Sequence, residues 1–152
     1  MISIKEIDLQ LEKILSKEKY EHSWQVAKLA EKIARYYHIS AKKAKILGLI
    51  HDCAKDYSFD ELKVSINKYH IHLNEIEMFI PVIWHAYVGA EIARDIFGIH
   101  DREILDAIKY HSTASKYLSL LGKIIYIADK IEPGRDIENI EKVRDLVWKD
   151  ID

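Results

Sequence analysis

Apolar residues recur along the chain at every third or fourth position, the spacing that places them on one face of an α-helix. No segment alternates apolar and polar residues for long enough to predict a β-strand. We therefore expect an all-α helical bundle. The apolar stripes of the expected helices are Ile4, Ile7, Leu11 and Ile14; Val26, Leu29, Ile33 and Tyr37; Leu47 and Ile50; Leu62, Ile66 and Tyr69; Trp84, Val88, Ile92 and Ile96; Ile104, Ile108 and His111; Leu118, Leu121, Ile125 and Ala128; Ile140, Val143 and Val147.

Residues that favour helix ends mark several boundaries. Ser58 and Glu61 have the spacing of a capping box, in which the two side chains bind free N–H groups at the start of a helix. The other expected ends are Ser40, which caps a helix that runs to about Ala54; Asp101, a second N-cap; Asn74, the start of a short helix that Pro81 interrupts; Gly98, behind a C-terminus; and the turn Glu132-Pro133-Gly134.

The composition fits one helical domain without nucleic-acid-binding character. The chain has 152 residues, the size of one domain, and its 5 Gly and 2 Pro are too few for the many turns of a β-sandwich. Lys and Arg number 23 against 25 Asp and Glu, a net charge of −2. Because proteins that bind nucleic acid usually carry a basic excess, we expect no nucleic-acid partner.

Cysteine usage and apolar runs indicate the compartment. Cys53 is the single cysteine, which excludes an intramolecular disulfide and a multi-cysteine metal site. Charged residues recur throughout the first twenty positions, so no signal peptide is expected. The longest apolar runs, such as FIPVIW, are far shorter than the roughly 18 residues that cross a bilayer. We expect a cytoplasmic protein with no membrane partner.

Histidine and aspartate side chains supply the candidate chemistry. Four histidines each lie on or beside the apolar stripe of a different expected helix, one aspartate directly follows the second of them, and another extends a stripe. Buried imidazoles and carboxylates are costly without partners, and a common metal ion offsets that cost. Mixed nitrogen and oxygen ligands suit Fe, Mn, Zn or Co. The six candidate ligands are His22, His51, Asp52, His85, His111 and Asp129.

The adjacent pair His51 and Asp52 indicates two metal ions. Neighbours on a helix point about 100° apart, so they do not easily chelate one ion from one face. They can serve two ions side by side, with the Asp52 carboxylate bridging, and paired metals of this kind hydrolyse phosphoesters. The remaining histidines occupy expected helix ends or polar segments and are predicted to lie at the surface: His38, His70, His72 and His100.

The order of these ligands, with four blocks around them, resembles the HD superfamily of metal-dependent phosphohydrolases. The blocks are HDCAK (51–55), WHAYVGA (84–90), YHST (110–113) and ADKIEPGR (128–135). Within that superfamily they are similar to the YqeK family, the HD-domain symmetrical diadenosine tetraphosphate hydrolases. The resemblance runs from about Tyr20 to about Leu146 and implies a single HD domain over residues 1–152, with a metal-binding core at about 20–135.

The resemblance also implies a ligand set, a cofactor and a reaction. One metal would be held by His22, His51, Asp52 and Asp129, and the other by Asp52, His85 and His111. The cofactor would be two Fe ions, with Mn, Co or Zn as alternatives. The substrate would be a dinucleoside polyphosphate, cleaved centrally so that diadenosine tetraphosphate yields two ADP. The family further implies a homodimer.

Basic and hydroxyl side chains near these blocks are candidates for contact with phosphate. Lys55 lies four residues after His51 on the same helical face, where its ammonium would reach a phosphate near the metals and assist catalysis. Arg135 follows a proline–glycine turn, where its guanidinium would bind phosphate through two hydrogen bonds. Thr113 offers a hydroxyl just after the fourth histidine. Glu132 is expected to orient Arg135 or to contact substrate.

Two other functions remain open from the sequence. The same ligands would serve an HD hydrolase of another nucleotide, such as a nucleoside monophosphate, a cyclic nucleotide or a magic-spot nucleotide. The domain would also serve as a nucleotide-binding module that holds metal without turnover. Replacement of Asp52 by Ala tests the expected bridging ligand, and a panel of nucleotides tests the substrate.

Overall fold

The computed structural model describes residues 2–152, and these form helices joined by turns, with no β-strand among them. The prediction of an all-α protein is confirmed. The helices are α1 (Ile4–Ile14), α2 (Lys17–Tyr36), α3 (Ala41–Ile50), α4 (Phe59–Lys68), α5 (Glu75–Met78), the 3-10 helix η1 (Pro81–Ile83), α6 (Trp84–Asp95), α7 (Arg102–Tyr110), α8 (Leu120–Ile131) and α9 (Ile140–Leu146).

Most helix ends lie where the sequence predicts them. Ser58 and Glu61 form the capping box of α4, and Ser40, Asn74 and Asp101 cap α3, α5 and α7. Gly98 follows α6 with a φ of 60°, a conformation that favours glycine. Each of these signals acts within a few residues, which is why the sequence reveals it.

Four predictions about helix extent and facing are wrong, and one of them concerns Val143, assigned to the apolar stripe of the last helix but 38% exposed. The third helix ends at Ile50 instead of Ala54, because the chain turns at 51–56 and carries the HD pair out of the helix. Leu118 precedes α8, since the Ser119 hydroxyl caps that helix by accepting from Gly122 N–H. Ile96, assigned to the apolar stripe of α6, is 43% exposed because the helix ends one residue before it.

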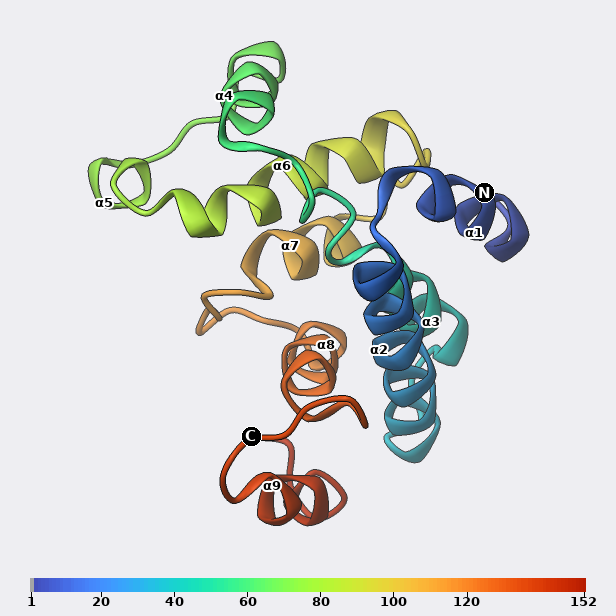
Figure 1. Ribbon diagram of the computed structural model, residues 1–152. Helices are drawn as coiled ribbons and strands as arrows, with labels where there is room; N and C mark the ends of the chain where they lie inside the picture. Colours follow the sequence, from blue (N-terminus) through green and yellow to red (C-terminus); the bar gives the residue numbers. More distant parts are fainter. Residues whose placement is uncertain (1) are drawn as a thin grey trace.

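Helices α2 and α3 pack along each other, and α8 lies against both (Figure 1). The close approach of α2 and α3 depends on Gly48, where an added Cβ would stand 2.5 Å from Ala27 Cα. Helix α7 bridges α8 and α6, while α9 packs on α8 near the C-terminus (Figure 1). The core runs through all these contacts, and its largest fully buried side chains include Ile7, Leu11, Ile33, Leu47, Phe97, Ile108 and Ile125.

No helix in residues 2–152 combines the length and apolar content needed to cross a bilayer.

Candidate metal centre

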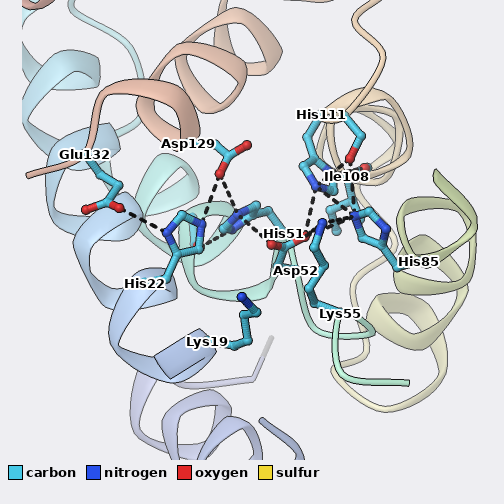
Figure 2. Close-up of polar contacts among 12 residues, drawn as sticks. Lys19, His22, His51, Asp52, Lys55, His85, Ile108, His111, Asp129 and Glu132 are labelled. Carbon is cyan, nitrogen blue, oxygen red and sulfur yellow. Dashed lines mark hydrogen bonds and ion pairs between the residues drawn. The ribbon is translucent and has the colours of Figure 1, made fainter. Parts of the chain in front are cut away.

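Five helices bring the six candidate ligands to one place inside the bundle. His22 lies in α2, His51 and Asp52 at the end of α3, His85 at the start of α6, His111 at the end of α7 and Asp129 near the end of α8. All but His22 are at most 5% exposed, and the side chain of His22 is 12% exposed. Figure 2 shows their imidazoles and carboxylates pointing toward one another in a row.

The main chain orients three of the imidazoles. The Nδ1 atoms of His51, His85 and His111 lie 2.7, 2.8 and 2.7 Å from the carbonyl oxygen three residues earlier. Because a carbonyl oxygen only accepts, each Nδ1 donates, and in the neutral imidazole the lone pair then lies on Nε2, which faces the interior of the cluster. This is the form in which a neutral imidazole binds a metal ion.

The two oxygens of Asp52 face different histidines. Oδ1 lies 3.0 Å from His111 Nε2 and 3.2 Å from His85 Nε2, whereas Oδ2 lies 3.7 Å from His51 Nε2. The carboxylate therefore stands between the two halves of the row in Figure 2. This is the position expected of a ligand shared between two ions.

The second carboxylate, Asp129, closes the other half of the row. Its Oδ1 lies 3.0 Å from His22 Nε2 and 3.8 Å from His51 Nε2. The same oxygen accepts from Arg135 Nη2 at 3.0 Å, and Oδ2 pairs with the ammonium of Lys130. The Asp129 carboxylate thus contacts imidazole nitrogens as well as the side-chain cations of Arg135 and Lys130.

A buried nitrogen without a hydrogen-bond partner in the described part of the chain, Nε2 of His51, indicates that the imidazole and carboxylate groups around it suit a metal ion. Within residues 2–152, Nε2 of the fully buried His51 has no hydrogen-bond partner, and the facing carboxylate oxygens are 3.7 and 3.8 Å away. A cation between nitrogen and carboxylates satisfies that atom, and nitrogen with oxygen donors suits Fe, Mn, Co or Zn. Two groups have donor atoms within 4.8 Å of one another: His22, His51 and Asp129; and His51, Asp52 and His111.

Neighbouring charges keep the carboxylates ionised despite their burial. Burial opposes the charge on Asp52, but the imidazoles around it outweigh burial and hold its pKa well below the usual range. Asp129 is also buried, and contacts with His22 and Lys130 lower its pKa. At His51, Asp52 and Asp129 overcome burial and raise the pKa of the imidazole, because the position favours positive charge. A metal cation meets the same preference.

A cavity of about 410 Å³ opens beside the row of ligands. Asp52, Asp129 and His22 line its floor, and the predicted phosphate-binding residues Lys55 and Arg135 also line it. Their placement beside the ligands agrees with the expected contact with phosphate. Two further cations that sequence reasoning missed also line the cavity, Lys19 and Lys130, together with the acidic side chains of Glu18, Glu21 and Glu132.

Local spacing could have revealed those two lysines. Lys19 precedes His22 by three residues on one face of α2, and Figure 2 shows it pointing toward the row of ligands. Lys130 directly follows Asp129 and pairs with its carboxylate. Both therefore bring positive charge to a cavity that is lined by acidic side chains as well.

The hydroxyl that lines the cavity belongs to Ser112 and not to the predicted Thr113. Thr113 is exposed, donates to the carbonyl oxygen of Ala114, and is absent from the cavity lining. The neighbouring Ser112 lines the cavity instead, with its hydroxyl 3.1 Å from His111 Nε2 and 3.2 Å from His85 Nε2. The structure does not bring Thr113 to the ligands.

The single cysteine lies in the core, and the remaining histidines take the places expected of them. Cys53 is fully buried, and burial raises the pKa of its thiol, so it is no nucleophile. The four histidines predicted at the surface are exposed: His38, His70, His72 and His100.

Comparison with known proteins finds a matching family model and similar proteins that share one name. A family model described as "HD domain" matches residues 20–134. The chain is 36% identical to the Bacillus subtilis (strain 168) protein named "Bis(5'-nucleosyl)-tetraphosphatase, symmetrical", over 90% of this chain and 73% of that protein. A protein of the same name from Staphylococcus aureus is 34% identical, over 93% of this chain and 75% of that protein.

A solved structure gives the same result for the fold. The crystal structure of a "predicted HD superfamily hydrolase involved in NAD metabolism" from Clostridium acetobutylicum matches with a TM-score of 0.94 and 34% identity. The match covers 99% of this chain and 80% of that chain, so nearly every helix described above has a counterpart.

Proposed function

The chain belongs to the HD domain family, and on that premise we propose that it is a metal-dependent phosphohydrolase that splits diadenosine tetraphosphate into two ADP. The Bacillus subtilis and Staphylococcus aureus relatives, both named as symmetrical tetraphosphatases, support this choice of reaction. The chain aligns with about three quarters of each, including the whole row of ligands.

The observation that carries the proposal is Asp52 with its two oxygens turned toward different histidines. We assign two ions to the centre, and iron as the metal. One ion would be held by His22, His51, Asp52 and Asp129, and the other by Asp52, His85 and His111. Such a pair would supply an activated water and offset the negative charge that develops on the reacting phosphate.

The chain's own cations bind and orient the phosphates. Lys55 Nζ lies 3.1 Å from His85 Nε2, and Arg135 Nη2 lies 3.0 Å from Asp129 Oδ1, so one cation stands beside each half of the row. Both cations line the cavity, so they can contact different phosphates of one substrate. Water adds to one of the two central phosphorus atoms, the bridging P–O bond breaks, and each half leaves as ADP.

Replacement of Asp52 tests the proposal. We expect Asp52→Ala to lower turnover of diadenosine tetraphosphate at least about a thousandfold, equivalent to about 4 kcal/mol of transition-state stabilisation, because both halves of the row lose a ligand. Asp60→Asn, at an exposed position in α4, is the matched control and should retain full activity. Near wild-type turnover by Asp52→Ala would overturn the assignment.

The nucleotide panel separates this reaction from its alternatives. Nucleoside monophosphates, cyclic nucleotides and magic-spot nucleotides should be turned over more slowly than diadenosine tetraphosphate by the same metal-loaded protein. Preference for one of them would keep the hydrolase and change the substrate. Tight nucleotide binding without any hydrolysis would instead indicate a binding module.

A further inference from the structure

The four histidines of the centre are held at Nδ1 in two different ways. Three of them donate to main-chain carbonyl oxygens, as described above. The Nδ1 of His22 instead faces a carboxylate, Glu132 Oε1, at 3.3 Å. Figure 2 shows Glu132 on the far side of the His22 ring from Asp129, outside the row of ligands.

The position of His22 within its helix explains the difference. His51 and His111 stand at the C-caps of α3 and α7, where the carbonyl groups of the last turn lack part of their intrahelical donors and accept from an imidazole; Ile108 O also accepts from His111 N–H at 3.4 Å. His85 stands at the start of α6 and donates to Val82 O in the preceding 3-10 helix. His22 lies inside α2, where the nearby carbonyls already accept α-helical N–H groups. An acceptor for its Nδ1 must come from another element.

The turn after α8 is built to present Glu132 as that acceptor. Glu132 is only 4% exposed, and its Oε2 accepts from Gly134 N–H at 2.5 Å. A Cβ at Gly134 would stand 3.0 and 3.1 Å from the carboxylate oxygens, so glycine leaves the room that the carboxylate occupies. Arg144 of α9 donates to the main-chain oxygen of Glu132 at 2.9 Å and holds the turn in place.

We propose that Glu132 is a positioning residue that acts through His22. By accepting from Nδ1 it fixes the tautomer and the ring orientation of His22, and so presents Nε2 beside Asp129 as a metal ligand. A carboxylate behind a ligating histidine also makes the ligating nitrogen more basic, and loss of such a partner typically weakens metal binding about 10–100-fold. This role rests on the proposed metal centre but not on the identity of the substrate.

Metal binding measured without any substrate tests the role. The full chain, stripped of metal, is titrated with Mn²⁺ by calorimetry. Glu132→Gln is nearly isosteric and keeps an acceptor oxygen, so we expect Mn²⁺ affinity to fall about tenfold, and Glu132→Ala to lose up to about 100-fold. Glu138→Gln, exposed in the same connecting segment, is the matched control and should bind as the wild type does. Thermal unfolding of each metal-free variant verifies that it folds.

A double-substitution cycle separates action through His22 from a general effect of the turn. Five ligands remain in His22→Ala, so Mn²⁺ binding there stays measurable. In that background Glu132→Gln should change affinity less than about twofold, because the group it positions is gone. An undiminished loss in the His22→Ala background, or wild-type affinity in both Glu132 variants, would overturn the role of Glu132 while leaving the proposed function intact. A wild-type chain that binds no Mn²⁺ would overturn both.

Discussion

At the scale of single residues, the two cations beside the row of candidate ligands, Lys55 and Arg135, are expected to contribute to catalysis. Lys55 contacts His85 and Asp52, and Arg135 contacts Asp129. Charge-assisted hydrogen bonds contribute about 1.5–3 kcal/mol, so Lys55→Ala and Arg135→Ala should each lower kcat/KM for diadenosine tetraphosphate by roughly 10–100-fold.

Steady-state kinetics at saturating metal check that expectation. Lys42→Ala, at an exposed position in α3, removes the same charge away from the cavity and should leave kcat/KM unchanged. An equal loss in Lys42→Ala would assign the effect to net charge. An unchanged kcat/KM in both Lys55→Ala and Arg135→Ala would show that these cations do not contribute to the reaction.

The same scale shows where sequence reasoning stops. The clustering of the six candidate ligands could be predicted because each lies on or beside the apolar stripe of an expected helix, which is a local signal. The hydroxyl could not be assigned, because Ser112 and Thr113 are neighbours and the turn after α7 decides which one faces the cavity. The Glu132 contact with His22 joins positions 110 residues apart, a separation that no spacing rule reaches.

At the scale of elements, the contact between α2 and α3 positions the centre, since these helices carry His22 and His51. A Cβ at Gly48 would stand 2.5 Å from Ala27 Cα and 2.8 Å from Ala27 N, which are main-chain atoms that cannot rotate away. Gly48→Ala should therefore push the helices apart, lower the free energy of unfolding by about 1–3 kcal/mol, and weaken metal binding. Urea unfolding measures the first effect.

Gly122→Ala in α8 is the matched control for that substitution. There the added Cβ would meet Leu118 Cδ2 at 2.7 Å, the far end of a side chain that can move. Because alanine favours helix by up to about 1 kcal/mol over glycine, Gly122→Ala should leave stability equal or slightly higher. A Gly48→Ala variant as stable as Gly122→Ala would show that the α2–α3 approach is not tight.

Helix ends were predictable from sequence to the extent that capping is local. The Ser58–Glu61 box and the Asp101 cap need only residues three positions away. The end of α3 at Ile50 was not predicted, because buried residues, among them Cys53 and Ala54, continue although the chain has left the helix. Burial in that turn comes from packing between elements, and a helical stripe does not distinguish the two cases.

At the scale of the whole molecule, five helices meet around ionised groups that a metal would join. Bound metal stabilises only the folded chain, by about 2.7 kcal/mol when free metal is a hundred times its dissociation constant. For a domain of this size we expect Mn²⁺ to raise Tm by roughly 5–10 °C and a chelator to reverse the shift. The Asp52→Ala variant should show a smaller rise in Tm on addition of Mn²⁺. A wild-type Tm that does not change with Mn²⁺ would contradict the proposed metal centre.

The most direct test of the whole account is product analysis. The ferrous-loaded protein is incubated without oxygen with diadenosine tetraphosphate, and the nucleotides are separated by anion exchange. We expect ADP as the sole product, because cleavage between the two central phosphorus atoms yields identical halves. ATP together with AMP, or no turnover by fully metal-loaded protein, would contradict symmetrical hydrolysis by this centre.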